Sequence, residues 1–166
     1  MKSTKGKILF LTYSALIAAL YVAFTWISNA FGLASMAIQV RLSEALCVLS
    51  FFTPAAPVGM FVGCLISNLT MGSTPLDIIF GSLATLIGSY LGTKIKFKWL
   101  VPLPTVISNT VIVPFVIIAS YTKEWSIGTY ALTTLGVFAG EVVSAYAIGI
   151  IVLMAISKHN VFKNQK

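Results

Sequence analysis

Long apolar segments alternate with short polar connections along the whole chain of 166 residues. About 20 apolar residues in a helix are long enough to cross a hydrocarbon core of about 30 Å. Loops that carry Gly, Pro, Lys or Asn separate six apolar segments, and we expect spans at 8–27, 34–53, 58–71, 77–92, 101–119 and 131–156. The pattern predicts an all-α, polytopic membrane protein with six transmembrane helices in a single domain, 1–166.

The second apolar segment differs from the others because an amide and two ionised side chains, Gln39, Arg41 and Glu44, stand at its start. The apolar part after Glu44 ends at Phe52 and is too short to cross a bilayer alone. Either the helix starts near Ala34, or its first residues are unwound and line a cavity. Ionised groups are costly in a membrane, so a ligand site is the first interpretation. An ion pair that joins two helices is the alternative.

Other polar side chains interrupt the later apolar segments. Glu141 lies about 15 Å along the sixth predicted span, where a carboxylate needs a ligand or a partner such as Arg41. Asn109, in the middle of the fifth span, needs another helix or a ligand. Asp77 opens the fourth span. Its carboxylate is explained equally well by a favourable interaction with the helix dipole and by contact with a ligand. Further candidates for substrate contacts are Asn68, Trp125 and Tyr146.

The charge distribution predicts the orientation. The chain carries 11 basic and 4 acidic residues, a net charge of +7. The lysines form short clusters between apolar segments, which argues against nucleic-acid binding. With six spans, nine lysines lie on the side of both termini and Lys123 alone lies on the other. The positive-inside rule then places both termini in the cytoplasm and Gln39, Arg41 and Glu44 in the outer half of the membrane.

No motif indicates an enzyme, a metal site or a cofactor. The spans hold no Ser or Cys nucleophile with a His partner, and HExxH, CxxC and phosphate-binding Gly-rich loops do not occur. We interpret Cys47 and Cys64 as small packing residues. Charged groups of both signs at one depth argue against a channel, which needs a series of sites. A pocket that opens outward fits the residues better.

The polar residues also favour one kind of ligand. A carboxylate accepts two parallel N–H bonds from an amidine-like edge such as that of guanine, and a second carboxylate suits an ionised amine. Trp125 and Tyr146 offer rings that could stack on a flat heterocycle. We therefore expect a small, planar, cationic solute.

Four blocks of the sequence resemble the QueT family, namely QVRLSEAL at 39–46, FFTPAA at 51–56, GCLISN at 63–68 and DIIFGSLATL at 77–86. This family comprises substrate-binding S components of energy-coupling factor (ECF) transporters, assigned to precursors of queuosine. The resemblance covers roughly the whole chain. It implies the six-helix ECF S-component fold in a bacterial cytoplasmic membrane.

The resemblance also implies partners and a substrate. An S component works with a coupling transmembrane subunit and two cytoplasmic ATPases. It meets the coupling subunit through an Ala-x-x-x-Ala pattern on the first helix, which Ala15 and Ala19 supply here. The implied substrate is a deazapurine, either 7-aminomethyl-7-deazaguanine or queuine. The alternatives are an S component for biotin, thiamine or riboflavin, and a membrane scaffold protein that transports nothing.

Overall fold

The computed structural model describes residues 4–33, 40–123 and 125–159, and every regular element within them is helical. This confirms the all-α prediction for that part of the chain. The elements are α1 (Thr4–Ala30), η1 (Leu42–Phe51), α2 (Ala56–Thr70), η2 (Asp77–Gly81), α3 (Ser82–Gly92), η3 (Lys98–Leu100), α4 (Leu103–Ile117), η4 (Ile118–Thr122), α5 (Ile127–Glu141), η5 (Val142–Ile148) and α6 (Gly149–His159).

Three continuous helices are long and apolar enough to cross a membrane: Thr4–Ala30, Lys98–Thr122 and Ile127–Lys158. They contain the predicted spans 8–27, 101–119 and 131–156. Three shorter apolar helices are Leu42–Phe51, Ala56–Thr70 and Asp77–Gly92. Large apolar side chains such as Leu11, Leu132 and Ile151 are exposed on the outside of the bundle. These features indicate a multi-pass membrane protein.

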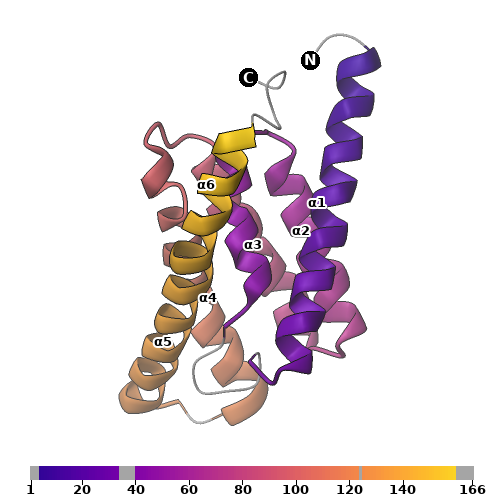
Figure 1. Ribbon diagram of the computed structural model, residues 1–166. Coiled ribbons are helices and arrows are strands. Elements are labelled where there is room, and N and C mark those ends of the chain that lie inside the picture. The colour runs from indigo at the N-terminus through magenta and orange to yellow at the C-terminus, as the bar shows by residue number, and fades with distance from the viewer. Residues whose placement is uncertain (1–3, 34–39, 124, 160–166) are drawn as a thin grey trace.

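Figure 1 shows α1 beginning and α6 ending at the same end of the bundle, and α5 beginning near the opposite end. One face of α1 packs into the bundle, and its buried positions follow helical spacing: Ser14, Ile17, Ala18, Tyr21, Thr25 and Ser28. A Cβ on Gly63 of α2 would lie 2.6 Å from Tyr21 Cβ, so the two helices are in close contact there. Ala15 and Ala19 lie on the other, exposed face of α1.

The element η1 lies inside the bundle and is buried from Ser43 to Ser50. It is a 3₁₀ helix of ten residues, longer than is usual for this type. The helix begins at Leu42, and Arg41 before it is extended (φ −103°, ψ 105°). Of the two predicted alternatives for this segment, the unwound start agrees with the extended backbone at Arg41. Gln39 and the rest of 34–39 lie outside the described residues.

Side chains of α1 fix the start of η1. Ser28 Oγ accepts a hydrogen bond from Leu42 N at 2.9 Å, and Thr25 Oγ1 donates to Ser43 Oγ at 2.8 Å. These bonds lie near the end of α1 that is remote from Thr4. The first turn of η1 is therefore anchored at that end of the bundle. Cys47 and Cys64 are free and buried, which agrees with their expected packing role.

Candidate functional site

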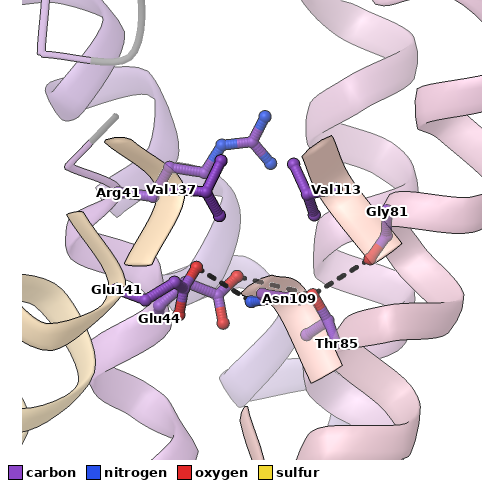
Figure 2. A pocket seen from close by; sticks show the side chains of 8 residues that line it. All are labelled: Arg41, Glu44, Gly81, Thr85, Asn109, Val113, Val137 and Glu141. Atoms are coloured by element: carbon purple, nitrogen blue, oxygen red, sulfur yellow. Dashed lines mark hydrogen bonds between the residues drawn. The ribbon is translucent and has the colours of Figure 1, made fainter. Parts of the chain in front are cut away.

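A cavity lies between η1, α3, α4 and α5, and most of its polar lining was singled out by the sequence (Figure 2). The lining residues are Arg41, Glu44, Gly81, Thr85, Asn109, Val113, Val137 and Glu141. The cavity volume is about 20 Å³. In this conformation it has room for about one water. The structure thus brings four predicted site residues together: Arg41, Glu44, Asn109 and Glu141.

Glu44 lies in the first turn of η1 and is 1% exposed. Its Oε1 accepts a hydrogen bond from the Tyr21 hydroxyl and another from Thr85 Oγ1 at 3.4 Å. Its Oε2 has no hydrogen-bond partner among the described residues. A buried carboxylate oxygen without a donor is costly, so Oε2 is available to a donor group in the cavity.

Glu141 is the last residue of α5, where the helix widens into the π-helical η5, and it is 7% exposed. Its Oε1 accepts a hydrogen bond from Asn109 Nδ2 at 2.9 Å. Glu141 Oε2 and Asn109 Oδ1 have no partner within the part of the chain that the structure describes. The partner of this carboxylate is therefore Asn109. The sequence analysis had considered Arg41 for this role.

Together these residues leave three buried acceptor atoms without a donor: Glu44 Oε2, Glu141 Oε2 and Asn109 Oδ1. In Figure 2 the two carboxylates and Asn109 lie close together, and the Arg41 guanidinium lies apart from them. Two ionised carboxylates at one small cavity repel each other unless a cation lies between them. The three unpaired acceptor atoms make the site complementary to a group with several N–H donors.

Arg41 makes its ion pair with Asp77, and not with either glutamate of the cavity. The distance from Arg41 Nη2 to Asp77 Oδ2 is 3.7 Å. Asp77 lies in the first turn of η2, and a Cβ on Gly81 would come within 2.7 Å of its Oδ1. Asp77 does not line the cavity. It compensates the charge of Arg41, which leaves the guanidinium less suited to bind an anion.

Three other predicted site residues lie away from this cavity. Asn68 Nδ2 donates to the backbone carbonyl of Asp77 at 3.2 Å and thus joins α2 to η2. Trp125 is exposed, and its ring centre lies 5.0 Å from that of Phe115. Tyr146 packs against the hydrophobic core. None of the three lines the cavity in this conformation, and their contact with a ligand stays a prediction.

The sequence interpretation missed two residues that hold Glu44 in place. Tyr21 is fully buried on α1, and Thr85 lies on α3 and also donates to Gly81 O at 3.2 Å. A signal existed for Tyr21, because it falls on the same helical face as Ser14, Thr25 and Ser28. No pattern distinguishes Thr85 from the other hydroxyl residues of the spans.

The fold is similar to that of a solved protein described as "Crystal structure of an S-component of ECF transporter". The TM-score is 0.60, with 18% sequence identity over 99% of this chain and 90% of the other. At this identity the likeness shows a shared fold. The helical bundle around the cavity is therefore of the ECF S-component type, as the sequence resemblance implied.

The family comparison is more specific. The model of the QueT transporter family matches residues 11–158, and the chain belongs to that family. A relative from Lactococcus lactis subsp. cremoris (strain MG1363), "Queuosine precursor transporter QueT", is 36% identical over 86 residues. This match covers 51% of the chain and 50% of that relative, about half the length of each. The predicted resemblance to the QueT family is confirmed.

Proposed function

We propose that this chain is the substrate-capture subunit of an ATP-driven ECF importer and that its substrate is a queuosine precursor. The candidate substrates are 7-aminomethyl-7-deazaguanine and queuine. Membership of the QueT transporter family and the name of the relative support this class of substrate. The observation that carries the proposal is the set of three buried acceptors without donors at Glu44, Asn109 and Glu141.

The chemistry of these acceptors fits the proposed ligands. The guanine edge of a 7-deazaguanine offers parallel N–H donors, and its side-chain amine is a cation near neutral pH. One carboxylate of the pair Glu44 and Glu141 accepts the guanine edge in a charge-assisted bidentate contact. The other carboxylate pairs with the amine, and Asn109 Oδ1 accepts a further N–H. A cation between the carboxylates also relieves their repulsion.

The same geometry argues against two alternatives. An anionic vitamin such as biotin would need Arg41, which Asp77 already compensates. A scaffold protein that binds nothing would pair its buried charges internally and fill the space between them. Here the two glutamates each keep one oxygen without a partner among the described residues, and a cavity lies beside them. A ligand site accounts for both features.

A bicyclic base needs more room than the present cavity offers. Val113, Val137 and the Arg41 side chain are the walls that have to move apart, because the carboxylate side is fixed by Tyr21 and Asn109. Substrate binding is then coupled to rotation of these three side chains, while the hydrogen bond between Asn109 on α4 and Glu141 on α5 is kept. The conformation with the narrow cavity is the form that excludes ligand.

Membership of the family supports a further proposal on membrane placement and partners. In this proposal the three long and three shorter apolar helices make six crossings of a bacterial cytoplasmic membrane, with both termini in the cytoplasm. Ala15 and Ala19, exposed on α1, contact the coupling transmembrane subunit. Two cytoplasmic ATPases supply the energy, and this chain is no enzyme itself. Membrane lipid surrounds the remaining surface.

Thermal unfolding of the purified full chain in detergent tests the substrate. A ligand that binds only the folded state raises the midpoint, by an amount that grows with the logarithm of its concentration relative to Kd. We expect 7-aminomethyl-7-deazaguanine and queuine to raise the midpoint, and biotin, thiamine and riboflavin to leave it unchanged. A shift with one of these vitamins alone would refute the substrate class, and no shift with any ligand would favour the scaffold alternative.

A further inference from the structure

A second hollow in the structure lies outside the candidate site, between α3 and α4 on the exposed surface of the bundle. This groove has a volume of about 400 Å³ and is lined by apolar side chains except at Ser108. Ile87 and Leu91 of α3 form one side, and Leu103, Ile107 and Val111 of α4 form the other. On each helix these residues recur every four positions, so they make two ridges with a trough between them.

The floor of the groove is a close contact between the two helices. A Cβ on Gly88 would lie 2.5 Å from both Ser108 Oγ and Thr105 Cα. Ser108 Oγ lies within hydrogen-bond distance of Ala84 O (3.0 Å) and of Pro104 O (2.8 Å), so its single proton already has an acceptor. From Leu103 to Val111 the groove is about 12 Å long by helical rise. It offers a narrow apolar trough with no free hydrogen-bonding group at Ser108.

Three lysines stand at one end of this groove, in the connection between α3 and α4. Lys94 N donates to Leu91 O at 2.9 Å, so Lys94 lies one turn beyond a groove residue. Lys94 Nζ lies 5.1 Å from the Tyr90 ring centre, and Lys98 Nζ lies 4.8 Å from that of Trp99. Lys96 is exposed. None of these lysines has a carboxylate partner within 4–33, 40–123 and 125–159.

We propose that the groove and these lysines bind one anionic phospholipid, with an acyl chain in the trough and the phosphate at the lysines. The charge complementarity selects the occupant. A zwitterionic lipid offers the same chain but no net negative charge for Lys94, Lys96 and Lys98. Each lysine near a membrane surface favours an anionic lipid by about fivefold. The tyrosine and tryptophan rings beside them are suited to the depth of lipid headgroups.

Native mass spectrometry of the full chain tests the headgroup. The protein in detergent is incubated with equal amounts of phosphatidylglycerol and phosphatidylcholine that carry the same acyl chains. We expect one phosphatidylglycerol to be retained in preference, and the triple variant K94Q/K96Q/K98Q to lower that preference at least tenfold. The matched control K5Q/K7Q/K158Q removes the same charge from α1 and α6 and keeps the preference. Equal retention of both lipids by the native chain would refute the proposal.

A groove-filling variant tests the acyl chain. Ile107→Trp narrows the trough and is expected to lower lipid retention at least tenfold, whereas Leu132→Trp on the exposed face of α5 has no effect. Circular dichroism and the elution profile check that each variant is folded. If K94Q/K96Q/K98Q loses the lipid but Ile107→Trp keeps it, the lipid binds to a basic surface patch. That result would refute the proposed acyl-chain site in the groove. If Ile107→Trp keeps its lipid but no longer binds the coupling subunit, the groove is a protein interface instead.

Discussion

Asn109 and Glu141 meet between α4 and α5, where Asn109 Nδ2 lies 2.9 Å from Glu141 Oε1. Each of the two side chains also keeps one oxygen without a donor among the described residues. The bond fixes the direction of both side chains before any ligand arrives. In the proposed complex, side chains that are already ordered lower the entropy lost on binding.

Glu141→Gln is predicted to weaken binding of 7-aminomethyl-7-deazaguanine by about 10- to 100-fold, since a hydrogen bond to a charged group contributes about 1.5–3 kcal/mol. Stability should not fall, because the amide fits the same space and a buried charge is removed. Isothermal titration and thermal unfolding measure the two effects. Unchanged affinity and uptake would exclude Glu141 from the site.

Arg41→Gln and Glu44→Gln are predicted to differ in their effect on the same ligand. Glu44 offers a free oxygen to the cavity, so its amide variant should lose at least tenfold in affinity. Arg41 is already paired with Asp77, so its variant should lose less than Glu44→Gln. Titration of both variants gives the comparison. The opposite order would indicate an anionic substrate.

Tyr21→Phe is predicted to lower the free energy of unfolding by about 1–3 kcal/mol, because Glu44 loses a donor in a buried environment. Ring packing is kept, so the loss reports the hydroxyl. Tyr130→Phe at an exposed position of α5 is the matched control, with little expected change. Denaturation in detergent measures both. Equal stability of the two variants would show that the Tyr21 bond contributes nothing.

The double variant A15L/A19L is predicted to abolish co-purification with the coupling subunit while deazapurine binding by the isolated chain is kept. Both alanines are exposed on α1, where larger side chains would hold a partner helix away. Ala131→Leu on the exposed face of α5 serves as the control and should leave assembly intact. Assembly of A15L/A19L at the native level would remove this face from the interface.

Hydrophobic periodicity and the cost of buried charge were enough to predict the helical fold and to single out four residues that line one cavity. Arg41, Glu44, Asn109 and Glu141 stand out in sequence because each interrupts an apolar segment, and the structure gathers them around one cavity. The ion-pair partner of Arg41 could not be predicted in the same way. Which acid meets Arg41 depends on how helices far apart in sequence pack, so Asp77 could not be distinguished from Glu141 as its partner.

The sequence also did not predict that the second apolar segment forms a 3₁₀ helix. Its residues are apolar and suit any helix, and only the surrounding packing selects a 3₁₀ form from Leu42 to Phe51. Trp125 and Tyr146 were considered as stacking rings because of their chemistry alone. Their actual neighbours, Phe115 and the hydrophobic core, follow from tertiary contacts that no local pattern encodes.

Three hydrogen bonds from one side of α1, at Tyr21, Thr25 and Ser28, tie that helix to the first turn of η1. The opposite side of the same helix carries Ala15 and Ala19. If α1 tilts, these hydrogen bonds carry the first turn of η1 with it, and Glu44 moves together with α1. A displacement of the exposed face of α1 therefore reaches the candidate site across the width of a single helix.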